Sequence, residues 1–273
     1  MEEHVSALTQ WVNHVFGVWA LWLLHALHIQ PENYETPIPE YVVMSLMVLV
    51  LLVVLALILR SQLSVERPGT MQQFAEGLLT NPLGFGIKDV LDASVSHGAE
   101  RFIPFVGTIA IFVLFANLLG LVPALHSPTS FAVVPLACAS LVFLYFNWHG
   151  IRHHGPLGYA KHLTGPIWWL AWLNFPVEVL SISARLLSLT VRLWANIFAS
   201  DLIYVLFFGL LLGPFNWAVD KNWLLGVPFG ILVVAVPLVF ILLHVFVSFV
   251  QAYIFAVLPA IYIGDAIAEG HTD

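Results

Sequence analysis

Polar side chains recur at helical spacing inside a long apolar stretch that includes TVRLWANIFASD, from Thr190 to Asp201. At about 100° per residue, several of them share one narrow stripe of a helix. They are Glu178, Ser181, Arg185, Ser188, Arg192 and Asn196. A charge at the centre of a transmembrane helix costs roughly 2.5–3.5 kcal/mol. Arg192 therefore needs either a partner that compensates its charge or a functional role.

A second polar stripe lies further along the chain and comprises His244, Ser248 and Gln251. Asp201 follows Arg192 at a rotation of about 900°, so it points to the opposite face of the first helix. If the two helices form an antiparallel hairpin through a loop around Asp220, then Asp201 and His244 lie at similar depth. We expect these two side chains to form a carboxylate–imidazole pair, which is a group that can exchange protons.

Each of these residues also has a structural interpretation. Arg185 could extend its guanidinium to the membrane interface, whereas Arg192 lies two turns deeper, about 10 Å further in. Ser181 and Ser188 could be packing hydroxyls, and Asn196 or Gln251 could join neighbouring helices. The occurrence of two polar stripes on two very long apolar segments favours a functional role.

Composition places the chain among polytopic helical membrane proteins. Of its 273 residues, 60% are hydrophobic and only 9% are charged, which is too apolar for a soluble domain. The net charge of −7 argues against a nucleic-acid partner, and no phosphate-binding GxxxxGK[ST] loop occurs, so we expect no directly bound nucleotide and no cofactor. The one cysteine, Cys138, cannot form an internal disulfide. The acidic N-terminus lacks the basic region of a signal peptide.

The apolar segments predict an all-α protein with five transmembrane helices and an amphipathic surface helix. Three spans have ordinary length, and we place them at 41–59, 102–122 and 131–146. Two are much longer, about 177–213 and 226–264, and a helix of that length would measure roughly 55 Å against a hydrocarbon core of about 30 Å. We therefore expect the last two helices to form a long, steeply tilted hairpin.

The basic residues orient the chain. Most of them fall in two loops, 60–101 and 149–165, which five spans place on the same side of the membrane. By the positive-inside rule, we expect these loops and the C-terminus to be cytoplasmic and the N-terminus to be outside. The predicted segments are an extracytoplasmic N-terminal segment with an interfacial helix (1–38), a transmembrane helix (39–60), a cytoplasmic amphipathic segment (61–101), a transmembrane hairpin (102–148), a cytoplasmic loop (149–170), the long hairpin with the ion path (171–264) and a cytoplasmic tail (265–273).

Three stretches make the sequence similar to a known family. SLTVRLWANIFASDLI resembles the central motif of subunit a of bacterial-type rotary ATP synthases. RFIPFVGTIAIFVLFANLLGLVP, followed by SPTS, resembles the third-helix block of that family, and HVFVSFVQAYIFAVLPAIYI resembles its last-helix block. The resemblance extends from about Arg67 to Tyr262.

The resemblance implies roles for individual residues. Arg192 falls on the essential arginine that faces a carboxylate of the rotating ring, with Asn196 and Gln251 beside it. Asp201, His244 and Ser248 fall on the outer proton half-channel. The inner half-channel is assigned to Glu178, Ser181, Arg185 and Ser188. Implied partners are a ring of c subunits, peripheral-stalk b subunits and membrane lipid. The implied location is the bacterial plasma membrane, and ATP itself is made on other subunits.

Two other functions are possible. WHGIRHHG places His149, His153 and His154 at a spacing found in di-iron oxidases, but such sites need several histidine boxes, so we assign no metal. An ion-coupled secondary transporter would also use buried Arg, Asp and His, yet the sequence has neither repeated halves nor central helices broken by Gly and Pro.

Overall fold

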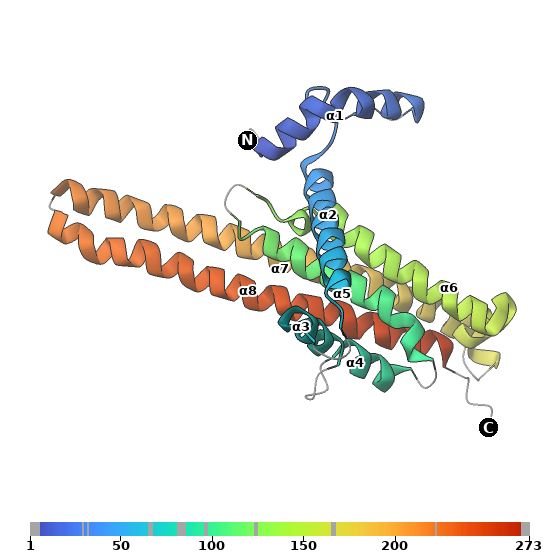
Figure 1. Cartoon of the computed structure of the whole chain (residues 1–273). Coiled ribbons are helices and arrows are strands. Elements are labelled where there is room, and N and C mark those ends of the chain that lie inside the picture. The colour runs from blue at the N-terminus through green and yellow to red at the C-terminus, as the bar shows by residue number, and fades with distance from the viewer. Residues whose placement is uncertain are drawn as a thin grey trace.

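The computed structural model describes residues 6–28, 30–31, 33–64, 68–80, 86–95, 98–122, 125–164, 168–221 and 223–268. These residues form helices joined by short connections (Figure 1). The α-helices are α1 (Ala7–Ala26), α2 (Glu40–Ser61), α3 (Thr70–Leu79), α4 (Ile87–Ser94), α5 (Ile103–Leu119), α6 (Val133–Thr164), α7 (Ala171–Lys221) and α8 (Trp223–Ile267). The 3₁₀ turns are η1 (Ala99–Phe102), η2 (Pro128–Ser130) and η3 (Trp168–Leu170).

Within the described residues, five helices are long and apolar enough to cross a membrane: α2, α5 with η1, α6, α7 and α8. The expected all-α class with five spans is therefore confirmed. Helix α2 shows how the sequence defines such a span, because its apolar run begins after Glu40 and ends at Arg60. An acid in the first turn and a base in the last turn both interact favourably with the helix dipole.

Helices α7 and α8 form the long hairpin that the sequence predicts. They contain 51 and 45 residues and run side by side across the molecule (Figure 1). At 1.5 Å per residue, both exceed the roughly 30 Å hydrocarbon core by about a factor of two. Helices α5 and α6 pack against one half of the hairpin, and the other half extends beyond them.

The gap between the two predicted spans, 214–225, is mostly helical instead of loop, because α7 continues through Pro214 to Lys221 and α8 begins at Trp223. The two helices approach closely here. A Cβ atom on Gly226 would lie 2.5 Å from Cγ2 of Val219, and one on Gly230 would lie 3.3 Å from the Phe215 ring. Packing between the helices thus stabilises helical structure past a proline, as it does in other transmembrane helices.

Residues 149–164, expected to be loop, are also helical. Helix α6 continues to Thr164, with a kink at Gly155, whose φ is 73° and which precedes Pro156. Beyond the kink the chain folds back, and the Tyr159 hydroxyl donates to Oδ1 of Asn147 at 3.0 Å. A Cβ atom on Gly150 would lie 2.5 Å from the Tyr159 ring, so a glycine is needed where this ring packs.

The amphipathic segment forms two short helices, α3 and α4, beneath the hairpin (Figure 1). Ile87, Val90 and Leu91 of α4 are buried in the main hydrophobic core, which α5, α6, α7 and α8 complete. A Cβ atom on Gly264 of α8 would clash with the carbonyl oxygen of Ser94. Helix α4 therefore packs directly on the backbone of α8.

Candidate functional site

Helix α7 carries the predicted polar residues past two different environments. Near Ser200 it passes α5, η2 and α8, and there we define the His244 cluster as Asn117, Ser127, Thr129, Ser200 and His244. Fifteen residues earlier, about 22 Å along the helix, lies a cavity that we call the Arg185 pocket. Arg192 lies between the two.

His244 is the centre of its cluster and is only 5% exposed. Its Nε2 lies 3.1 Å from the backbone oxygen of Asn117, and its Nδ1 lies 2.9 Å from Oγ of Ser200. A carbonyl oxygen can only accept, so Nε2 carries the hydrogen in this bond. Nδ1 then accepts from Ser200 in the neutral ring and donates to it in the charged ring. The imidazole can therefore gain or lose a proton at Nδ1 without losing either partner.

Hydroxyl groups of η2 and the preceding residue fix Asn117 in place. Thr129 Oγ1 donates to Asn117 Oδ1 at 2.6 Å, and Ser127 Oγ donates to the backbone oxygen of Ala116 at 2.9 Å. The indole of Trp194 on α7 donates to the backbone oxygen of Ser130 at 3.0 Å. Buried and partly buried hydrogen bonds thus join the end of α5, η2 and α7, and together these elements position the carbonyl that holds His244.

The direct contact expected between Asp201 and His244 does not form. No ion pair joins them within the described parts of the chain, because the ring nitrogens of His244 bind Ser200 and Asn117 instead. The predicted depth is nevertheless right, since Ser200 precedes Asp201 directly. The side chain of Asp201 is partly buried, and the charges of His244 and His126 both act on it.

Arg192 is partly exposed, and its Nη2 makes one long hydrogen bond, 3.4 Å to Oγ of Ser188 one turn earlier. Among the described residues no carboxylate forms an ion pair with it. Gln251 of α8 is 2% exposed, and its side-chain oxygen has no partner there either. No hydrogen bond joins Arg192 to Gln251 in the described chain, and Asn196 is exposed on α7.

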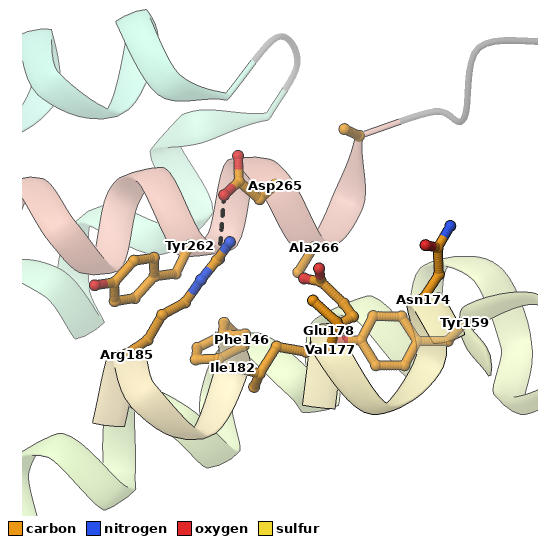
Figure 2. A pocket seen from close by; sticks show the side chains of 11 residues that line it. Phe146, Tyr159, Asn174, Val177, Glu178, Ile182, Arg185, Tyr262, Asp265 and Ala266 are labelled. Atoms are coloured by element: carbon orange, nitrogen blue, oxygen red, sulfur yellow. Dashed lines mark hydrogen bonds and ion pairs between the residues drawn. The ribbon is translucent and has the colours of Figure 1, made fainter. Parts of the chain in front are cut away.

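The Arg185 pocket has a volume of about 430 Å³ and opens between α7, α8 and α6. Its lining includes Phe146, Tyr159, Asn174, Val177, Glu178, Ile182, Arg185, Tyr262, Asp265 and Ala266 (Figure 2). Arg185 extends from α7 to α8, where its Nη1 donates to Oδ2 of Asp265 at 3.1 Å. Its guanidinium carbon also lies 4.9 Å from the centre of the Tyr262 ring. Two predicted polar residues, Glu178 and Arg185, therefore share one cavity.

The predicted serines differ in their surroundings. Ser188 accepts from Arg192, as described, and Ser181 is partly buried one turn from Glu178 and Arg185. Ser248 is fully buried, and its hydroxyl donates to the backbone oxygen of His244 at 2.8 Å. The Ser248 hydroxyl thus bonds its own helix in this conformation.

The histidines of WHGIRHHG do not converge on a metal site. Over the described ranges, no three His, Cys, Asp or Glu side chains come close enough to hold a metal ion. The His149 ring packs 5.1 Å from the Phe102 ring and 4.5 Å from the Tyr145 ring.

Sequence reasoning missed several residues of both regions. Asn117, Ser127 and Thr129 belong to a quoted block but follow no polar stripe, since they come from a helix end and a turn. Asp265 was assigned to a tail beyond the last span, although it lies in α8. Only its spacing of three residues from Tyr262, on the same face of one helix, could have indicated that it faces the pocket.

Known proteins resemble this chain over most of its length. Residues 42–264 match the family described as ATP synthase A chain. ATP synthase subunit a of Koribacter versatilis is 37% identical over 249 residues, which covers 91% of each chain. The subunit a of Solibacter usitatus is 38% identical over 235 residues, which covers 86% of this chain and 90% of that protein. The subunit a of Trichlorobacter lovleyi is 36% identical over 249 residues, which covers 91% of this chain and 94% of that protein.

These matches agree with the membrane helices and with the buried polar clusters on the long hairpin. They also explain why no nucleotide-binding motif occurs, since subunit a is a non-catalytic part of the membrane sector. The chain therefore belongs to the subunit a family of bacterial rotary ATP synthases, the multi-pass membrane subunits through which protons are conducted.

Proposed function

We propose that this chain provides two offset proton half-channels, with Arg192 between them at the interface with a rotating ring of c subunits. The observation that carries the proposal is the position of Arg192. It lies on a membrane-spanning helix midway between the His244 cluster and the Arg185 pocket, and no carboxylate among the described residues neutralises it. An uncompensated cation in a membrane is costly, so a carboxylate from another subunit is the partner that this position requires.

In this mechanism the outer half-channel uses Asp201, His244 and Ser248. A proton arrives at Asp201, passes to Nδ1 of His244 and leaves towards the ring, while the bond from Nε2 to Asn117 keeps the imidazole in place. Ser200 and Asn117 position the ring, and Ser248 lies one turn on, towards Gln251. The His244 cluster supports this role because both partners of the imidazole tolerate a change in its charge.

The inner half-channel uses Glu178, Ser181, Arg185 and Ser188. Protons released from the ring reach the cytoplasm through the Arg185 pocket, whose polar lining and volume suit water. The two regions are separated by about 22 Å along α7, and in this mechanism no continuous water path joins them. A proton must therefore travel with the ring, and each charge that crosses the field supplies about 2.3 kcal/mol per 100 mV.

Arg192 is the barrier between the half-channels. Its positive charge favours the ionised form of each ring carboxylate that passes, so the carboxylate releases its proton before it crosses. Asn196, exposed one turn further along α7, offers its amide to the same carboxylate, and Gln251 of α8 is assigned to the same region.

Replacement of Arg192 by alanine tests the proposal. We expect Arg192→Ala to abolish proton-driven ATP synthesis in sealed vesicles while the complex still assembles with its c ring. Arg192→Lys should also fail, because an ammonium is a compact, strongly hydrated charge without the planar fork of a guanidinium. Arg152→Ala, which removes an exposed arginine of α6 outside both regions, is the control. Normal synthesis by Arg192→Ala would refute the assignment.

We also propose an orientation with the N-terminus outside the cell and the basic segments inside, next to peripheral-stalk b subunits. Helix α1 then lies along the outer surface of the plasma membrane. It runs across the end of α2 (Figure 1), with Thr9, Asn13 and Gly17 buried against the chain and Trp11, Trp19 and Trp22 more than 60% exposed. A tag near Glu35 should react with impermeant reagents in intact cells, and a tag near Gly155 should not.

A further inference from the structure

A titratable pair, Glu40 and His126, lies next to the His244 cluster. Glu40, the first residue of α2, has a carboxylate oxygen 2.9 Å from Nδ1 of His126. The Glu40 side chain is only 13% exposed, whereas the His126 side chain is 54% exposed. The backbone N–H of Ser6 also donates to the same Glu40 oxygen, at 3.4 Å. The pair therefore has a fixed, mostly covered acid and an imidazole that reaches the surface.

The pair is connected to the buried polar residues by position and by charge. His126 directly precedes Ser127 of the His244 cluster. The charge of His126 acts on Asp201, as does that of His244. Among the described residues, the ionisable groups near His126 are thus Glu40 of α2 and Asp201 of α7, and His244 of α8 also acts on Asp201. His126 is the most exposed member of this series, and His244 is the most deeply buried.

We propose that the Glu40–His126 pair is the proton-collecting mouth of the outer half-channel and delivers protons to Asp201. This inference rests on the proposed function, in which Asp201 and His244 form the outer path. His126 takes a proton from the aqueous phase on Nε2 while its Nδ1–H donates to Glu40. It then gives the Nε2 proton to the Asp201 carboxylate, directly or through water, and returns to the neutral ring.

The geometry favours this role over a purely structural one. An ion pair with a half-exposed imidazole adds little to stability. The pair therefore contributes little to holding α2 against the turn before η2. For proton collection, exposure is a requirement, because the ring must exchange protons with water. The covered carboxylate of Glu40 stabilises the imidazolium during transfer, and its bond to the Ser6 N–H holds it in position.

The test uses the whole ATP synthase, reconstituted in vesicles and driven by an imposed proton gradient. In His126→Gln the amide can still hydrogen-bond to Glu40 but cannot carry a proton. We expect ATP synthesis to fall roughly threefold to tenfold, less than at a buried relay because water can partly replace the imidazole. The deficit should grow as the outer solution becomes more alkaline, and free imidazole should restore the rate. Glu40→Gln should give a smaller deficit with the same pH trend.

The control is His14→Gln, which removes an exposed histidine of α1 that touches neither region. It should match the unmodified complex at every pH. A structural role for His126 predicts instead less assembled complex, with no rescue by imidazole and no pH trend. Unchanged synthesis by His126→Gln at all outer pH values would overturn the inference.

The variant His244→Gln separates this failure from that of the proposed function. If it blocks synthesis while His126→Gln is normal, only the proton-collecting mouth is wrong. If it also works normally, the outer path itself is wrong.

Discussion

The His244 cluster and the Arg185 pocket are both polar regions beside the same helix, yet their side chains are arranged in opposite ways. In the cluster, Asn117, Thr129 and Ser127 are at most 1% exposed, and short hydrogen bonds fix them. In the pocket, the Arg185–Asp265 pair lines a cavity of about 430 Å³, with Asp265 54% exposed. One region is filled by protein, and the other is open to water.

Under the proposed function, this difference implies two ways to move a proton. Where protein atoms fill the space, a proton must be handed between side chains, so the identity of each titratable group matters. Where a polar cavity admits water, the water can carry the proton, and each lining residue matters less. Substitutions in the two regions should therefore differ in the size of their effect on proton transport.

Within these two regions, the largest effect is expected for His244→Gln. The carboxamide can donate to the Asn117 carbonyl and contact Ser200, so the complex should assemble, but it cannot carry a proton. We expect proton-driven ATP synthesis to fall by about 10² or more, the usual contribution of a positioned acid–base group. The measurement is ATP synthesis in vesicles, with subunit a quantified in the same membranes.

Thr190→Val is the control for that experiment. Like His244, Thr190 is a buried polar residue, and it lies on α7. Its hydroxyl donates to the backbone oxygen of Leu186, at 2.9 Å. It should synthesise ATP normally. Loss of synthesis in His244→Gln that merely follows loss of the subunit would make His244 a structural residue.

A several-fold effect is expected for Thr129→Val. It removes the 2.6 Å hydrogen bond to Asn117 and leaves a buried carboxamide oxygen without a donor, at a cost of about 1–3 kcal/mol. Both the amount of assembled complex and the rate per complex should fall, because Asn117 holds His244. Thr108→Val, at an exposed threonine of α5 that bonds its own helix, is the control. Equal rates per complex in the two variants would show that Asn117 needs no such support.

A smaller effect is expected for Glu178→Gln in the Arg185 pocket. Water in the cavity can bypass the missing carboxylate, so we expect synthesis to fall only about twofold to threefold, well below the range of a positioned acid–base group. Proton release on the side that the proposed orientation makes cytoplasmic can be followed by a trapped pH dye. A loss as large as that of His244→Gln would break the comparison, since it would mean that the pocket also depends on one side chain.

The smallest effect is expected for Asp265→Asn. The Arg185–Asp265 pair is partly exposed, and such pairs contribute about 0–1 kcal/mol. Synthesis and the amount of complex should stay within about twofold of the unmodified protein. Raising the salt concentration should change neither. A strong, salt-sensitive defect would indicate that this ion pair closes the pocket.

The sequence predicted the membrane class, the number of spans and the hairpin of two long helices, because apolar length and periodicity report them directly. The sequence predicted the ends of helices less well, because packing between helices can override local signals such as proline. Pro214 does not end α7, since Gly226 and Gly230 let α8 pack against that turn. Residues 149–154 remain helical because nothing interrupts α6 before Gly155, where the chain kinks and a second helical stretch runs on to Thr164.

The same division applies to the candidate site. Helical periodicity alone determined that Arg185, Arg192 and Asn196 share one face of a helix and that Asp201 points away from it. Sequence spacing could not show that Asn117, 127 residues before His244, provides the carbonyl that holds its imidazole. Nor could it show that Glu40 meets His126 across 86 residues. Periodicity acts within one helix, whereas these contacts join different helices and turns, so only the tertiary structure decided them.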